Sequence, residues 1–338
     1  MFKKKIAIFK NETVQKLLGL KEYKFFKNAF STQKFQFNFN TFHFYDGLVF
    51  VIFGISLPFI LNILITYKVV NINNIINNRQ LLIFLIDICS AVFVISYFLL
   101  RYKLYFIYQK GLIFFFIILF LPIVNQLINF IMQDIFFKHF AIFFGTYKLR
   151  DPFWPKVVSL ISQVITEILA IFLIFIYDKN TWLRIKYFYK DSYYCFLVIG
   201  FIVIFNLLNL IITNLTSLKF LSKNQDSLTQ FYKTTFSIII FGLFTIIVAP
   251  IFEELTTRHG VFLLSGNKIL GFFASSIFFA GMHVSTSGDW ASITSYLAAG
   301  FVLSAIFIFL NGNVAYAITT HSIINIIAFT IGLINFHQ

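Results

Sequence analysis

The chain has 338 residues, of which 59% are hydrophobic and only 12% are charged. So few charged side chains cannot solvate a body of this size, which excludes a water-soluble globular protein and indicates lipid as the second solvent. The formal net charge of +14 does not indicate nucleic acid, because the basic residues gather in the N-terminal segment and between apolar runs, where they would meet anionic lipid headgroups.

Residues 1–46 are interpreted as a basic N-terminal arm. Nine lysines lie between Lys3 and Lys34, and a Lys-rich segment before the first membrane helix is typical of the cytoplasmic side. We therefore expect a multi-pass protein of the cell membrane with a cytoplasmic N-terminus and with the lipid bilayer as its surroundings.

The arm is followed by apolar runs long enough to cross the hydrocarbon core. Backbone in lipid must satisfy its own hydrogen bonds, and the alternating pattern of a membrane barrel is absent, so these runs are expected to be α-helices. Pro250 lies inside the sixth run and is expected to kink it or to split it in two. The prediction is therefore an all-α polytopic membrane protein of eight or nine transmembrane helices. The runs lie at about 47–67, 81–100, 112–132, 157–177, 194–215, 235–263, 268–285, 291–310 and 313–335.

The positions of the ionisable side chains divide the membrane part of the chain into two regions. Residues 47–234 are predicted to be transmembrane helices of unrecognised type. Nearly all ionisable groups inside apolar runs come later, in residues 235–338. Such groups cost several kcal/mol each in lipid and are functional candidates by default, so residues 235–338 are the expected catalytic core, with a cavity inside the membrane.

Three polar clusters lie in this core. In the first, Glu254 and Arg258 are four residues apart and can pair on one helix face, while Glu253 lies about 100° round the helix and can face another group. The second ends at His283. The third places His321 and Asn325 four residues apart on one helix face.

The depth of these groups can be compared. At about 1.5 Å per residue from the turn near Gly266, Glu253 lies roughly 20 Å deep and His283 roughly 25 Å deep. From the turn near Gly312, His321 lies roughly 14 Å deep. All three groups are expected in the interior of the bilayer, where they can meet in one cavity.

A carboxylate and two histidines in a partly dry cavity can carry out hydrolysis. Glu253 and His283 can activate a water molecule, and His321 and Asn325 can donate hydrogen bonds to the oxyanion. Equally, Glu253, His283 and His321 can form a Zn²⁺ site with one open position for water. The sequence is compatible with hydrolysis without a cofactor and with hydrolysis assisted by Zn²⁺.

The order of these motifs resembles the CAAX-protease and bacteriocin-processing (CPBP) family, which includes the type II CAAX prenyl endopeptidases. The resemblance covers about residues 235–335. It implies that Glu253 and His283 activate water, that His321 and Asn325 stabilise the oxyanion or complete a metal site, and that Glu254, Arg258 and Phe279 play supporting roles. His259 stands where the family usually has glycine. The matching positions are Glu253-Glu254-x-x-x-Arg258, Phe279-x-x-x-His283 and His321-x-x-x-Asn325.

The resulting hypothesis is an intramembrane endopeptidase of glutamate or metallo type. It would hydrolyse a peptide bond near a membrane-associated peptide or protein tail. The alternative is a non-catalytic protein of the same fold that acts as a scaffold, an immunity factor or a subunit of a membrane assembly. The expected partners are therefore a peptide or protein substrate for the enzyme, and other membrane proteins for the alternative.

Overall fold

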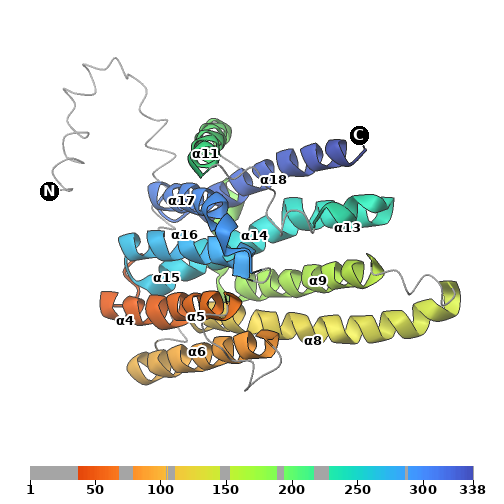
Figure 1. The fold of residues 1–338 in the computed structure, drawn as a ribbon. Coiled ribbons are helices and arrows are strands. Elements are labelled where there is room, and N and C mark those ends of the chain that lie inside the picture. Colours follow the sequence, from red (N-terminus) through yellow and green to blue (C-terminus); the bar gives the residue numbers. More distant parts are fainter. Residues whose placement is uncertain are drawn as a thin grey trace, which may run out of the picture.

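A computed structural model describes residues 37–67, 79–103, 105, 111–144, 153–188, 194–216, 228–285 and 288–337. Most of the predicted basic arm, residues 1–36, lies outside the described residues. The described segments are helices joined by short connections, and they contain no strand (Figure 1). The all-α prediction is confirmed.

Within the described ranges, the helices follow one another in nine long units, some of them built from several segments. The first unit comprises α4 (Phe44–Val49), η2 (Phe50–Ser56) and α5 (Leu57–Thr66), and the sixth comprises α13 (Thr235–Leu243), η5 (Phe244–Val248), α14 (Ala249–Glu253), η6 (Glu254–Gly260) and α15 (Val261–Ser265). The other long helices are α6 (Arg79–Tyr102), α8 (Gly111–Phe144), α9 (Phe153–Tyr177), α11 (Tyr194–Thr216), α16 (Lys268–Ser285), α17 (Ile293–Phe309) and α18 (Val314–His337). Shorter helices are α10 (Lys179–Phe188), η4 (Gln230–Lys233) and η7 (Trp290–Ser292).

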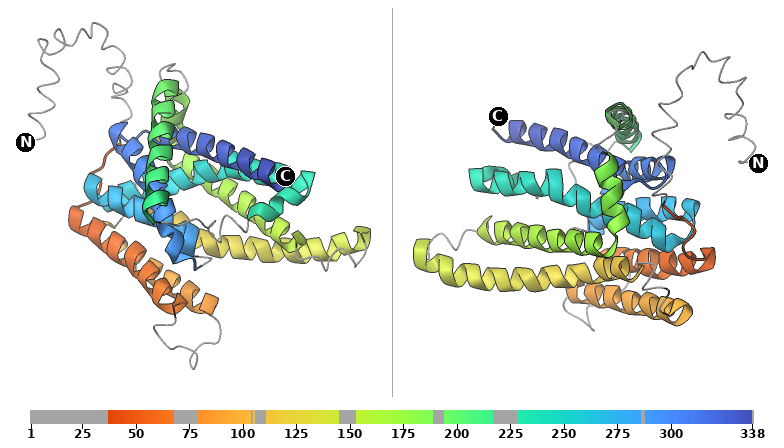
Figure 2. Two further views of the ribbon diagram at one scale, coloured as in Figure 1. Left: turned by 45° about the horizontal axis from the view of Figure 1, so that its top comes forward. Right: turned by 180° about the vertical axis from the view of Figure 1, so that it is seen from behind.

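Seven helices of the described chain are long and apolar enough to cross a membrane. They include the first and sixth units, α6, α9, α16, α18, and the η7–α17 unit from Trp290 to Phe309. α8 and α11 occupy the two remaining predicted runs. Most of the helices lie side by side, whereas α11 crosses them (Figures 1 and 2). The prediction of a polytopic membrane protein is confirmed.

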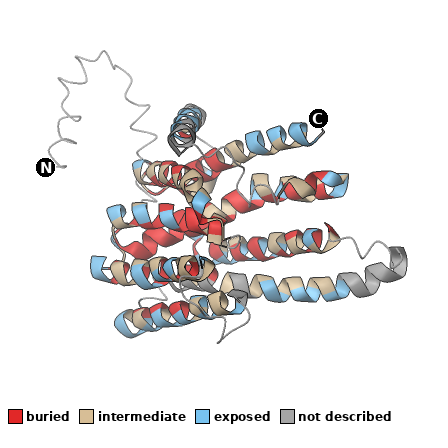
Figure 3. Cartoon of the chain, in the orientation of Figure 1, coloured by how far each residue is buried: buried red, intermediate tan, exposed pale blue. Residues whose placement is uncertain are grey.

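The outer surface of the described chain is apolar. Large hydrophobic side chains are exposed on several helices, including Leu100, Phe130 and Phe172. Buried residues concentrate where the helices meet (Figure 3). A surface of this kind suits contact with lipid chains and not with water.

The sixth unit is continuous over 31 residues, from Thr235 to Ser265, so Pro250 does not split it. Two segments of this unit, η5 and η6, are π-helices. A π-helix bonds each carbonyl to the amide five residues on, and such segments occur often at functional sites. α14 follows η5 directly, and Pro250 is its second residue, in the first turn, where a missing amide hydrogen is tolerated best.

The described end of the predicted arm is packed into the protein. Phe37, Phe39 and Phe42 are buried, and the amide of Phe37 donates to the carbonyl of Asn311. Gly266, which ends α15 with φ of +59°, leaves no room for a side chain, because an added Cβ would lie 2.3 Å from the carbonyl oxygen of Phe42. Residues 37–43 therefore bind to the ends of the C-terminal helices.

Small side chains bring α16 close to its neighbours. An added Cβ on Gly300 of α17 would lie 2.8 Å from the carbonyl oxygen of Ser276 on α16. The hydroxyl of Ser304 lies between those of Ser275 and Ser276, at 3.1 and 3.2 Å. Small residues and hydroxyl bonds are how helices associate within lipid, and here they fix the position of the helix that carries His283.

Candidate active site

The first motif lies near the middle of the sixth unit. Glu253 is the last residue of α14, and Glu254, Thr257 and Arg258 follow in η6. The hydroxyl of Thr257 donates to the carbonyl of Glu253 at 2.6 Å. Glu254 and Arg258 have no exposed surface. The motif therefore lies deep in the protein, where every charge needs a partner.

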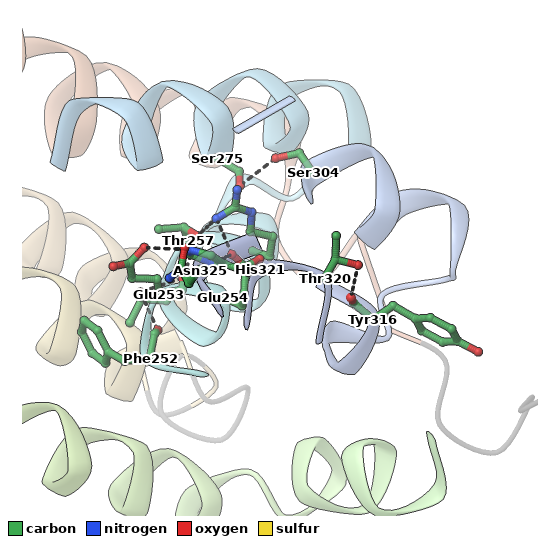
Figure 4. A network of polar contacts seen from close by, with 12 residues as sticks. Phe252, Glu253, Glu254, Thr257, Ser275, Ser304, Tyr316, Thr320, His321 and Asn325 are labelled. Atoms are coloured by element: carbon green, nitrogen blue, oxygen red, sulfur yellow. Dashed lines mark hydrogen bonds and ion pairs between the residues drawn. The ribbon is translucent and has the colours of Figure 1, made fainter. Parts of the chain in front are cut away.

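Glu254 forms the centre of a charged chain. Its Oε1 accepts from Nη1 of Arg258 at 3.0 Å, which confirms the predicted ion pair. The same oxygen lies 2.9 Å from Nδ1 of His321 on α18. A carboxylate only accepts, so this nitrogen carries the hydrogen. Figure 4 shows Glu254, Thr257 and His321 gathered at this point.

Glu253 faces both histidines. Its Oε2 lies 3.4 Å from Nε2 of His283 and 3.9 Å from Nε2 of His321. The side chains of Glu253 and His283 keep 16% and 22% of their surface accessible. Three helices thus bring together the carboxylate and both imidazoles, as the depth comparison predicted, and Glu253 and His283 remain partly exposed.

Aromatic rings hold the imidazoles in place. Phe279 contacts His283 and His321 edge-on, with ring centroids at 4.8 and 5.7 Å. The guanidinium of Arg258 lies 4.3 Å from the centre of the Phe279 ring. Tyr296 of α17 stacks on His283 at 4.6 Å. Phe279 therefore contacts both imidazoles and Arg258, and Tyr296 adds a contact that the motifs did not predict.

Asn325 is bound to the backbone. Its Nδ2 donates to the carbonyl of Thr245 in η5 at 2.8 Å. This carbonyl lacks its usual partners, because the amide of Ala249 bonds to Phe244 and position 250 is proline. Asn325 thus locks α18 to the sixth unit, and at least one of its two amide hydrogens does not point to a substrate.

The predicted zinc ligands do not form a metal site as the structure arranges them. No group of three or more His, Cys, Asp or Glu side chains in the described ranges could hold a metal ion. Nδ1 of His321 is bonded to Glu254, which leaves Nε2 as the nitrogen that faces Glu253.

A second buried pair involves the residue that departs from the family pattern. His259 is buried, and its Nε2 lies 3.2 Å from Oδ2 of Asp178, just before α10. The hydroxyl of Thr181 donates to the same Asp178 oxygen at 2.9 Å. The rings of Phe37 and Phe114 both lie 5.0 Å from His259. His259 therefore connects η6 to α8, α10 and the N-terminal segment.

Removing the carboxylate of this pair should destabilise the protein. We expect Asp178→Ala to lower the free energy of unfolding by about 1–3 kcal/mol, because His259 and Thr181 lose a buried acceptor. Thermal unfolding in detergent measures the effect, with Asp134→Ala at an exposed position of α8 as the control. Equal unfolding temperatures for the two variants would contradict a stabilising role of the pair.

One buried carboxyl group escaped the sequence interpretation. Glu167 lies in α9, is only 5% exposed and accepts a hydrogen bond from Nε2 of Gln163 at 2.9 Å. The signal was available, since Glu167 is an ionisable residue inside the predicted run 157–177. The ionisable residues after position 250 form motifs that point to a site, whereas Glu167 stands alone in its run.

Residues 235–327 match the family described as type II CAAX prenyl endopeptidase Rce1-like. The chain is also similar to an uncharacterized protein of Mycoplasma capricolum subsp. capricolum, with 32% identity over 187 residues. That alignment covers 52% of this chain and 55% of the relative, so the chain matches about half the relative's length. No solved structure matches the chain significantly. The predicted family resemblance is confirmed for the C-terminal helices.

Proposed function

We propose that this chain, whose residues 235–327 carry an Rce1-like domain of the CAAX-protease family, is an intramembrane endopeptidase. It hydrolyses a peptide bond near a membrane-associated peptide or protein tail. The observation that carries the proposal is the approach of one carboxylate oxygen of Glu253 to Nε2 of both His283 and His321. A site of this kind, partly buried within a helical bundle, has the acid–base groups that amide hydrolysis needs.

The proposal assigns the site a resting state in which its charges cancel. Arg258 is positive and Glu254 negative, and they form a buried pair. Glu253 adds a second negative charge, which a protonated His321 balances by donating through Nδ1 to Glu254 and through Nε2 toward Glu253 or a substrate oxygen. With His283 neutral, these groups sum to zero, as a site of low dielectric requires.

Hydrolysis can then proceed without a net change of charge. The carboxylate of Glu253 takes a proton from water as the water oxygen bonds to the carbonyl carbon. The negative charge moves from Glu253 to the carbonyl oxygen, where Nε2–H of His321 stabilises it. Collapse of this intermediate breaks the C–N bond, and the proton on Glu253 passes, directly or through His283, to the leaving amine.

The rival reading, a non-catalytic scaffold, accounts for part of the site. A scaffold would use the pair of Glu254 with Arg258 and the bond from Asn325 to Thr245, because both join helices. It does not explain why one carboxylate oxygen of Glu253 faces Nε2 of both His283 and His321 in a buried site. Burying that carboxylate costs stability, which favours the catalytic proposal.

A direct test uses the full chain in lipid nanodiscs. Membrane-bound peptides with free and with lipid-modified C-terminal tails are added, and mass spectrometry locates any new chain end. We expect cleavage that a Glu253→Gln variant lacks and that a metal chelator does not affect. Identical peptide patterns for the two proteins would support the scaffold, and loss of cleavage with chelator would show that the reaction needs a metal.

A further inference from the structure

The inference concerns the aromatic ring of Tyr296, a residue of α17 that belongs to none of the three motifs. Its ring stacks on the imidazole of His283, with the ring centroids 4.6 Å apart and the planes inclined by only 12°. Phe279, one helical turn before His283 on α16, contacts the same imidazole edge-on at 4.8 Å. Two aromatic rings therefore contact this imidazole, one nearly parallel to it and one steeply inclined.

The packing of α16 against α17 explains why Tyr296 reaches His283. The two helices run antiparallel and approach closely at Gly300, where an added Cβ would lie 2.8 Å from the carbonyl oxygen of Ser276. Tyr296 lies one turn before Gly300 on α17, and His283 lies two turns after Ser276 on α16. Residues four and seven apart share a helix face, so both side chains point into the same seam.

The plane of the His283 ring needs such a neighbour. The torsion about Cβ–Cγ of histidine has only a broad, roughly two-fold preference. His283 lies in the last turn of α16 and keeps 22% of its side-chain surface accessible, so general burial does not fix the plane either. A ring turned out of the stack would bring its edge into the Tyr296 ring at this separation. Within the stacked plane, Nε2 lies 3.4 Å from Oε2 of Glu253.

We propose that Tyr296 is a positioning residue of the active site, which fixes the plane of the His283 imidazole so that Nε2 stays directed at Glu253. This inference rests on the proposed function, in which His283 can pass the proton of Glu253 to the leaving amine. Proton transfer requires donor and acceptor within hydrogen-bond reach, and an imidazole that turns away loses that reach. Tyr296 takes part in no covalent step. α17, which carries none of the motifs, thereby contributes to the site.

Two replacements of Tyr296 and a matched control test the proposal with the full chain in lipid nanodiscs. Tyr296→Phe keeps the stacking ring, so we expect cleavage at a rate close to wild type. Tyr296→Leu removes the ring, so we expect kcat to fall about 10–100-fold with little change in KM, because a misplaced catalytic group slows the chemical step. The control is Phe301→Leu, which removes another stack between the same two helices, that of Phe301 on Phe272. It should lower thermal stability without lowering kcat.

Several outcomes would overturn the inference. Equal values of kcat in Tyr296→Leu and wild type would show that the stack is not needed. An equal loss of kcat in Phe301→Leu would reduce the contact to helix packing. A rise of KM at unchanged kcat would make Tyr296 a substrate contact, and a loss in Tyr296→Phe as large as in Tyr296→Leu would assign the effect to the hydroxyl group.

A second readout needs no cleavage, and so separates this inference from the proposed function. The ring current of a tyrosine shifts the protons of an imidazole stacked on it upfield, and NMR spectra of protein with labelled histidine detect the shift, with His283→Gln for assignment. We expect shifted His283 signals in wild type and Tyr296→Phe, but not in Tyr296→Leu. Unshifted signals in wild type would overturn the inference even if cleavage occurs. Shifted signals support the stacked arrangement, and a protein with this arrangement that cleaves no peptide would contradict the proposed function.

Discussion

Replacing Glu253 by glutamine is expected to lower the cleavage rate by about 10²–10⁴-fold while the protein stays folded. Glutamine has nearly the same shape but cannot accept the proton of the attacking water. The carboxylate oxygen lies 3.4 and 3.9 Å from Nε2 of His283 and His321, and the amide oxygen of glutamine can keep these contacts, so the fold loses little. Turnover of a peptide substrate and thermal unfolding of the same preparation, compared with wild type, measure both effects.

Further variants distinguish a proton acceptor from a structural carboxylate. His283→Ala should also reduce the rate, and the Glu253→Gln/His283→Ala double variant should be little slower than Glu253→Gln alone, because residues that act as a unit are not additive. Glu253→Asp keeps the charge but shortens the reach, and should retain a small part of the activity. A Glu253→Gln protein that unfolds, or that cleaves at the wild-type rate, would rule out the assigned role.

The helical spacing of the motifs explains how much of the site could be predicted. Four-residue spacing places Glu254 and Arg258 on one face, and the structure confirms their pair. The same geometry turns Glu253 toward a different neighbour, which proves to be both histidines. These features depend on helix geometry and on the order of the motifs along the chain, and both can be read from the sequence.

Other features depend on which helices meet, which spacing does not show. His259 and Asp178 lie 81 positions apart, and only the packing of α10 against the core joins them. The partner of Asn325 was missed because it is a backbone carbonyl, left over by the π-helical turn before Pro250. To predict that Glu167 is buried, one must know which face of α9 points inward. In lipid, most exposed and buried positions are equally apolar, so hydrophobic periodicity identifies that face poorly.

The second large expected effect is a loss of stability when the buried pair of Glu254 and Arg258 is broken. Arg258→Met should lower the free energy of unfolding by about 3–5 kcal/mol, because it leaves the carboxylate of Glu254 buried without its countercharge. Both side chains have no exposed surface, so water cannot replace the lost partner. Thermal unfolding and the yield of monodisperse protein in detergent measure the effect.

Removing both charges separates stability from activity. The Glu254→Gln/Arg258→Met double variant should recover much of the stability, since a buried ion pair is often replaced by neutral groups at little cost. It should not recover cleavage, because Nδ1 of His321 then lacks the anionic acceptor that stabilises its protonated form. A double variant that is both stable and fully active would show that the charge of Glu254 serves only to neutralise Arg258. Recovery of stability alone would instead assign to Glu254 a part in keeping His321 protonated for the oxyanion.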